Sequence, residues 1–408
     1  MRLIAGLTLI AGLAAPLAAV AQQATFALVS PENNEEQAAA THVSADGSVV
    51  IGWGGGYLAP GITVWRWTEA TGKVRLGAPP GYVECYPAGL TADGSTLFVN
   101  VWQGNVLVLW RWSSTGGWQL VGDIGGQVHA VNGDGMVFAG GTTVGGVARP
   151  FRWTGPGGLQ VIGPFGTLTG GTYLRGLSRD GAVLFGTDYT LAASARNYVW
   201  SAGGGFHAIP LLPTCQWGDA VAADRDGSAI VGSCALTQYA TPTLPWVWTA
   251  AGGVRPVVLT GAGGPQGAAT AISGDGMRIA GWYGDYGPAW LWSPTEGDRR
   301  VDALLTELGG NPWGVQIRGV TAISDDGRTL VGPLEGFFSY IARIPAFCYA
   351  NCDGSTAAPA LNVQDFGCFL TRYAAGEEYA NCDGSTAAPV LNVGDFSCFL
   401  QKYAARCP

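Results

Sequence analysis

The stretch Val43-Ser44-Ala45-Asp46-Gly47-Ser48-Val49-Val50-Ile51-Gly52 is a clear copy of a pattern that recurs along this chain of 408 residues. Its Asp-Gly pair appears seven times, and successive aspartates lie 41 to 51 residues apart. The aspartates are Asp46, Asp93, Asp134, Asp180, Asp226, Asp275 and Asp326. In a stretch without helical periodicity, this period is typical of four-stranded blades around an axis. The pattern predicts a mainly β fold, a seven-bladed β-propeller over residues 22–345.

The residues around each Asp-Gly pair favour a tight turn between two strands. A Ser, Thr, Asn or Asp two residues before the aspartate offers a side-chain oxygen to a backbone N–H, and the glycine supplies a positive φ. In six units a second glycine follows six residues after the aspartate, just past an apolar run, whereas the second unit has Val99 there.

Each unit also contains two aromatic residues separated by one residue. Residues i and i+2 of a strand project from the same face, so each pair presents one aromatic surface, which we expect to pack between blades. The unit thus predicts four antiparallel strands, with the aromatic pair in the third. The pairs are Trp65/Trp67, Trp110/Trp112, Phe151/Trp153, Tyr198/Trp200, Trp246/Trp248, Trp290/Trp292 and Phe338/Tyr340.

The seventh unit lacks room for a fourth strand, because its aromatic strand runs almost directly into Cys348. The segment 25–29 precedes the first unit and alternates like a strand. We expect it to pair as the outermost strand of the last blade and so to close the ring.

The first 21 residues have the features of a secretory signal peptide cleaved after Ala21: Arg2, an apolar stretch, and Ala19-Val20-Ala21. No later run is long and uncharged enough to span a bilayer, so no membrane span is expected. The chain has a net charge of -8 and no stripe of lysine and arginine, so no nucleic acid is expected as a partner. The mature protein is expected to be exported, extracellular or associated with the cell surface.

Motifs such as Val43-Ser44-Ala45-Asp46-Gly47 and the run 319–327 resemble the HAF repeats of exported bacterial proteins. The resemblance covers roughly residues 38–344. It implies a propeller-like fold and supplies no catalytic residues.

Residues 349–375 and 379–405 are nearly the same sequence at an offset of 30 residues. The second half of each copy has aromatic and apolar residues at helical spacing, for example Phe366, Phe369 and Tyr373. This tandem arrangement, over residues 346–408, resembles a dockerin or dockerin-like module with paired calcium loops of the EF-hand type. The resemblance implies a small disulfide-rich α-helical module that binds a cohesin-like or other cell-surface protein.

The resemblance also implies calcium (Ca) as a cofactor. Position 1 of each loop falls on Tyr349 or Tyr379, which lack a carboxylate, so any site is expected to be weak, with a Kd of about 10⁻⁴–10⁻³ M. The alternative is that Asn362 and Asn392 only cap their helices, beside Asp365 and Asp395. The expected metal ligands are Asn351, Asp353, Asn362, Asp365, Asn381, Asp383, Asn392 and Asp395.

Nine cysteines in an exported chain favour disulfide bonds. Equal separations suggest Cys352–Cys368 and Cys382–Cys398, although six tail cysteines permit 15 connectivities. Cys348 and Cys407 are then left to join the ends of the tail. In the propeller, the strand order brings Cys215 and Cys234 to the same face, which leaves Cys85 unpaired.

His42, His129 and His207 stand at non-equivalent places in their units, so we interpret them as strand residues rather than catalysts. Five of the tryptophans outside the core pairs fall on the face opposite the Asp-Gly turns, where they either contact a ligand or cover the ends of the blades. These candidate ligand-binding residues are Trp53, Trp102, Trp217, Trp282 and Trp313.

The leading hypothesis is a non-catalytic exported protein for binding or display, whose propeller recognises a ligand such as a polysaccharide and whose tail attaches it to a partner. The alternative is a polysaccharide-degrading enzyme, a glycoside hydrolase or lyase, on a propeller that carries a dockerin.

Overall fold

The structure is a computed structural model that describes residues 23–405 with short gaps. The expected signal peptide, residues 1–21, lies outside the described residues. The gaps are 32–36, 57–60, 164–170, 190–194, 238–242, 262–263, 346–347, 354–360 and 383–388, and residues 286, 295, 311 and 337.

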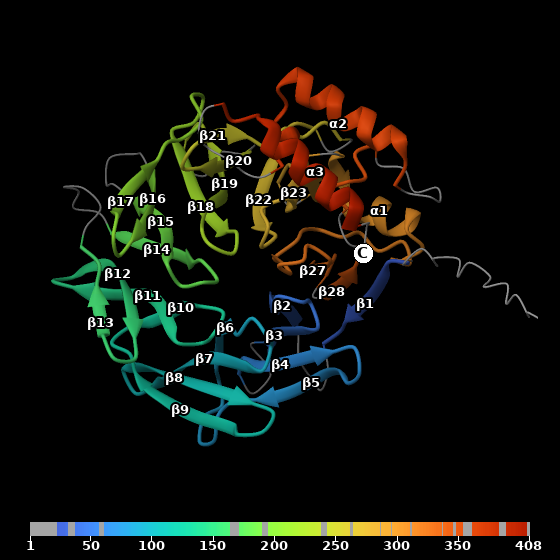
Figure 1. The fold of residues 1–408 in the computed structure, drawn as a ribbon. Helices are drawn as coiled ribbons and strands as arrows, with labels where there is room; N and C mark the ends of the chain where they lie inside the picture. The colour runs from blue at the N-terminus through green and yellow to red at the C-terminus, as the bar shows by residue number, and fades with distance from the viewer. Residues whose placement is uncertain are drawn as a thin grey trace, which may run out of the picture.

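The propeller consists of seven four-stranded antiparallel sheets arranged in a ring, as the repeat predicted (Figure 1). In each of the first six blades the strands pair in chain order, with the first strand at the central cavity. Blades one to three contain β2 (Gln37–Val43), β3 (Val49–Gly55), β4 (Thr63–Thr68), β5 (Gly72–Gly77); β6 (Tyr86–Leu90), β7 (Thr96–Gln103), β8 (Val106–Ser113), β9 (Gly117–Asp123); and β10 (Gln127–Val131), β11 (Val137–Val144), β12 (Val147–Thr154), β13 (Gly158–Val161). Blades four to six contain β14 (Thr172–Leu177), β15 (Val183–Tyr189), β16 (Ala195–Ser201), β17 (Gly205–Ile209); β18 (Trp217–Ala223), β19 (Ala229–Ala235), β20 (Leu244–Thr249), β21 (Gly253–Pro256); and β22 (Gly267–Ile272), β23 (Ile279–Tyr283), β24 (Ala289–Ser293), β25 (Gly297–Arg300).

The seventh blade combines both ends of the propeller, as predicted. It contains β26 (Ala322–Ile323), β27 (Thr329–Pro333) and β28 (Ser339–Arg343), and the N-terminal β1 (Thr25–Val29) pairs with β28 as the outermost strand. Backbone hydrogen bonds between the two ends therefore hold the ring closed.

The tail contains two helices, α2 (Val363–Ala375) and α3 (Val393–Ala405), and a short 3₁₀ helix, η1 (Glu378–Ala380). Its two copies pack around a shared core in which the rings of Phe369 and Phe399 stack at 4.2 Å and those of Tyr349 and Tyr379 at 4.7 Å. Each tyrosine hydroxyl donates to the backbone carbonyl of the other tyrosine. The helical spacing in the sequence thus corresponds to two related helices with a common interface.

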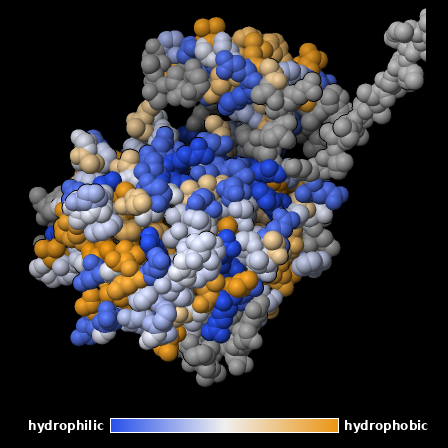
Figure 2. Space-filling model, turned by 60° about the horizontal axis from the view of Figure 1, so that its bottom comes forward, coloured by the Kyte–Doolittle hydropathy of each residue, from blue (hydrophilic) through white to orange (hydrophobic). Residues whose placement is uncertain are grey.

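The tail stands on one face of the propeller (Figure 2). Arg372 of α2 donates to the carbonyl of Pro294, which follows β24, at 3.5 Å. Burial lowers the pKa of Lys402 in α3, and the nearby carboxylate of Asp275 opposes this shift. Asp275 belongs to the Asp-Gly turn of blade six, so the tail contacts the face that carries these turns.

Three expected disulfide bonds are present: Cys215–Cys234, Cys352–Cys368 and Cys382–Cys398. Cys348 is also disulfide-bonded, but its expected partner Cys407 lies outside the described residues. Cys85 is a buried free cysteine, as expected. Such bonds indicate an oxidising environment.

The second glycine of the repeat leaves space for the first aromatic residue of the third strand. A Cβ atom on Gly232 would lie 2.0 Å from the carbonyl oxygen of Asp219 and 2.4 Å from the ring of Trp246. In the second blade Val99 lies opposite Trp110, which is only half-buried, whereas Trp246 is fully buried. The glycine–aromatic pairs are Gly52–Trp65, Gly140–Phe151, Gly186–Tyr198, Gly232–Trp246, Gly281–Trp290 and Gly332–Tyr340.

The aromatic pair predicted for the last blade is wrong by two residues. Tyr340, not Phe338, lies opposite Gly332, and the second position of the pair is Ala342. Phe338 precedes β28 and is 39% exposed. Phe338 stands directly before the strand and two residues before Tyr340, so the two together satisfied the spacing of the pair.

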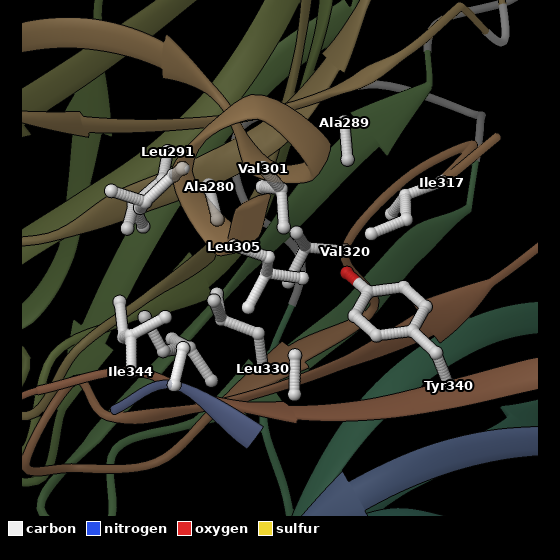
Figure 3. Close-up of a cluster of buried hydrophobic side chains, with 14 of the residues drawn as sticks. Ala280, Ala289, Leu291, Val301, Leu305, Ile317, Val320, Leu330, Tyr340 and Ile344 are labelled. Atoms are coloured by element: carbon white, nitrogen blue, oxygen red, sulfur yellow. The ribbon is translucent and has the colours of Figure 1, made fainter. Parts of the chain in front are cut away.

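The core between blades six and seven includes a short helix that the repeat did not predict, α1 (Val301–Glu307) (Figure 3). Its residues Val301, Leu304 and Leu305 are buried against both blades. Their i, i+3, i+4 spacing is the helical signal that was available in the sequence. The hydroxyl of Tyr340 donates to the carbonyl of Gly319 in the same core.

Deletion of residues 22–30 should lower the melting temperature sharply, because it removes the outermost strand and opens the ring. Differential scanning calorimetry of the chain with and without these residues would measure this effect. An unchanged melting temperature would show that β1 contributes nothing to closure.

Gly232→Ala should destabilise the propeller by about 1–3 kcal/mol, because the new methyl group would meet a backbone carbonyl and a buried indole ring. Gly203→Ala is the matched control, since nothing lies within 4 Å of a Cβ atom there. Urea unfolding of both variants provides the comparison, and equal midpoints would contradict the packing role of the glycine.

Candidate functional site

A closed ring of backbone hydrogen bonds surrounds the axis where the inner strands end. Seven N–H groups donate to carbonyl oxygens of the next blade, at distances of 2.6 to 3.2 Å. Six donors are the residue just before the Asp-Gly aspartate, and in the fourth blade Asp180 itself donates. The residues before the aspartates are Ala45, Ala92, Gly133, Arg179, Arg225, Gly274 and Asp325.

Three residues of this ring are charged and meet across the axis. The Nε atom of Arg179 lies 2.7 Å from Oδ1 of Asp325, and Nε of Arg225 lies 3.2 Å from Oδ2. Small residues elsewhere in the ring leave the necessary room, since a Cβ atom on Gly274 would lie 2.7 Å from Cβ of Asp325. An ion bridge therefore connects blades four and five to blade seven.

Each inner strand of the first six blades contains a β-bulge five residues before the Asp-Gly aspartate. A bulge redirects one side chain out of the regular alternation, and here the bulged residues line a central cavity of about 260 Å³. Thr321 holds the corresponding place in the seventh blade. The bulged residues are Thr41, Ala88, His129, Arg175, Val221 and Thr270.

The cavity is polar mainly on the side of blades three to five. Arg175 lies 3.1 Å from Asp219 through its Nη2 atom, and His129 precedes it on the neighbouring blade. Burial lowers the pKa of His129, and the positive charge of Arg175 contributes. On the opposite wall, burial and then Arg179 lower the pKa of His42 to about 4, so this imidazole is neutral at pH 7.

The histidine predictions hold in part. His42 and His129 lie in the inner strands β2 and β10, and His207 lies in the outer strand β17, as expected for strand residues. The first two nevertheless line the central cavity.

A second hollow of about 290 Å³ lies between blades one and two. Trp53, Tyr86 and Pro87 line it, together with Thr41 and His42, which also line the central cavity. The two spaces are therefore adjacent, and an aromatic surface lies beside the polar channel.

The structure places the five candidate tryptophans on the face opposite the Asp-Gly turns, but on separate blades. Trp102 and Trp313 are 55% and 60% exposed. Trp53, Trp217 and Trp282 are half-buried, and Trp282 lies over Gly319 of the next blade. The two exposed indoles are the better candidates for ligand contact, whereas Trp282 also fills space between blades.

Sequence reasoning missed the charged residues of the cavity. Arg179, Arg225 and Asp325 were present in the repeat, at the position before the aspartate where the other four units have alanine or glycine. Comparison of this one column between units would have identified three charges at equivalent places around an axis.

The first tail loop combines two carboxyl groups. Asp365 is fully buried and its Oδ2 atom accepts the N–H of Asn362 at 2.8 Å, while Oδ1 accepts the N–H of Asp353 at 3.2 Å. Burial raises the pKa of Asp365, and the carboxyl group of Asp353 adds to this shift. These carboxylate oxygens and the buried side-chain oxygen of Asn351 are ligands of the type that calcium takes in proteins.

The hydrogen bonds that the capping alternative requires are present. Asn362 accepts the N–H of Gln364 at 2.7 Å, and Asp365 completes a capping box at the start of α2. In the second copy Asn392 accepts the N–H of Gly394, and Asp395 accepts that of Asn392. Tyr349 and Tyr379 are core residues, and Asp383 lies outside the described residues.

The described part of the chain contains no group of three or more His, Cys, Asp or Glu residues arranged to hold a metal ion. Among its helices, none has the length and apolar character needed to cross a membrane.

No family model and no curated protein matches this sequence. Solved structures do match. An oligogalacturonate lyase from Vibrio parahaemolyticus aligns over 79% of this chain and 98% of its own, with 12% identity and a TM-score of 0.50. The β-propeller domain of the Trilobed protease from Pyrococcus furiosus, described as having an open velcro topology, aligns over 76% and 94%, with 10% identity and a TM-score of 0.50.

TolB from Acinetobacter baumannii aligns over 76% of this chain at 10% identity and a TM-score of 0.43, and the match spans only 64% of the TolB chain. At these identities the similarity is one of fold. The comparisons show a seven-bladed β-propeller of four-stranded antiparallel blades.

Proposed function

We propose that this protein is an exported binding or display module, in which the propeller holds a ligand and the tail attaches the molecule to a partner. The separation of the two faces is the observation that carries this proposal. The tail contacts the face of the Asp-Gly turns at Pro294 and near Asp275, while the candidate tryptophans lie on the other face. A molecule attached through its tail would thus leave the aromatic face exposed.

A polysaccharide is the ligand class that fits this face best. Exposed indole rings provide flat apolar surfaces for the faces of sugar rings, and Trp102 and Trp313 are the most exposed tryptophans among the candidates. Near Trp53, the adjoining hollow adds Tyr86 and the hydroxyl of Thr41.

The tail is proposed to act like a dockerin, with a cohesin-like or cell-surface protein as its partner. Its two copies share one core through the stacked Phe369 and Phe399 and the reciprocal tyrosine hydrogen bonds. Both helices leave apolar residues exposed at equivalent positions: Val363 and Leu370 in α2, and Val393 and Leu400 in α3. The export signal in residues 1–21 belongs to the same proposal.

Calcium is proposed to bind the first loop through Asp353 and Asp365, with Asn351 nearby. A bound cation would offset the cost of holding two carboxyl groups close together, one of them buried. This chain's own part is to position the carboxylates through the capping box at the start of α2.

Trp102→Ala should lower retention on the bound polysaccharide by roughly tenfold, because a stacked aromatic residue contributes about 1–2 kcal/mol. The mature chain, with calcium, would be applied to a polysaccharide array, and both retention and released sugar would be measured. Leu120→Ala, at an exposed residue of the outer strand β9, is the control. Equal loss in both variants would contradict a ligand face, and released sugar would favour a polysaccharide-degrading enzyme.

Millimolar calcium should slow amide hydrogen exchange in α2 by about tenfold at pH 7, given about ten times the Kd. The folded-state pKa of Asp365 is raised, so without a cation the tail loses stability as pH rises above the ordinary carboxyl pKa of about 4. The calcium effect should therefore fade as the pH falls and Asp365 becomes protonated.

Asp365→Asn should abolish the calcium effect on α2, while Asp123→Asn, at the exposed last residue of the propeller strand β9, should retain it. If calcium does not change the amide exchange rates of the parent protein, helix capping is the whole role of these residues.

A further inference from the structure

The central cavity contains a pair of arginines that one aspartate holds in place. Both contacts to Asp325 are made through Nε, from Arg179 at 2.7 Å and from Arg225 at 3.2 Å. Within the described residues, the Nη1 and Nη2 groups of these two arginines have no hydrogen-bond partner. Two guanidinium groups are thus fixed at one end, with their terminal nitrogens available.

The remaining carboxylate of the cavity lining does not compete for these groups. The Oδ2 atom of Asp224 accepts the hydroxyl of Ser228 at 2.7 Å and the N–H of Ala229 at 3.1 Å, within its own turn. Three arginines and two aspartates line the cavity, and Asp219, which lies 3.1 Å from Arg175, makes the arginines and aspartates of this region equal in number.

The site is accessible and small. The side chain of Arg225 is 61% exposed and that of Arg179 is 24% exposed, while Asp325 is only 9% exposed. The volume of about 260 Å³ lies just below the range of about 300–1,000 Å³ that is usual for small-molecule sites. A single sugar ring or a simple ion is a suitable size, whereas a polymer chain is not.

We propose that Arg179 and Arg225, oriented by Asp325, form a binding site for a small oxyanion in the central cavity. Guanidinium groups bind carboxylate and phosphate through paired N–H···O bonds of matching geometry. Fixing both groups in advance reduces the entropy lost on binding. The site lies at the Asp-Gly end of the axis and is distinct from the tryptophans of the opposite face.

Isothermal titration calorimetry of the mature chain would test this site with three probes: inorganic phosphate, glucuronate and glucose. Glucuronate and glucose differ at C6, where glucuronate has a carboxylate. If glucuronate binds and glucose does not, the charge is the recognised feature. Binding of phosphate alone would identify the tetrahedral anion as the ligand form. Absence of binding by both anions at 10 mM would overturn the proposal.

Arg225→Gln should weaken binding of the anion that binds by at least tenfold. Arg225→Lys should weaken binding less, because lysine keeps the positive charge and loses only the paired geometry. Arg225 is exposed enough for both variants to fold, which circular dichroism would verify. Arg111→Gln is the control, because Arg111 lies in β8, is not part of the cavity lining, and donates through Nε to Gln119. Equal affinity in Arg225→Gln and Arg111→Gln would overturn the assignment, while polysaccharide retention through Trp102 tests the proposed function separately.

Discussion

Closure of the ring is the constraint on which the rest of this structure depends. Each blade buries its faces only against its two neighbours, so an open ring would expose apolar surface at two ends. Two independent devices close it: β1 completes the last blade beside β28, and backbone hydrogen bonds join all seven blades around the axis. The central cavity exists because these hydrogen bonds hold the ends of the inner strands at a fixed separation.

The sequence predicted the fold well because the repeat expresses local requirements. A turn with positive φ needs glycine at Gly47 and its counterparts, and the packing of rings such as Trp246 needs glycine at positions such as Gly232. These requirements recur in every blade and so become visible as a period. The fourth strand of the last blade was equally predictable, since the seventh unit supplies only three strands and the segment before the first unit supplies one more.

The cavity was harder to predict because its chemistry breaks the repeat. Arg179, Arg225 and Asp325 lie on three different blades and meet only when the ring is closed. The bulges at residues such as His129 and Arg175 reverse the expected direction of one side chain, and simple alternation along a strand does not reveal this. The half-buried positions of Trp53 and Trp282 likewise depend on the neighbouring blade, which a single unit does not specify.

The place of β1 has a consequence for the order in which the protein folds. Thr25 pairs with Arg343, so β1 is synthesised before the other strands of the propeller and waits for the last of them. Contacts of such long separation form slowly, and an unpaired strand edge is prone to aggregation in the meantime. The disulfide-bonded tail comes after β28, so its folding does not need to precede closure. Chains of this design would therefore benefit from chaperones that shield β1 until the ring closes.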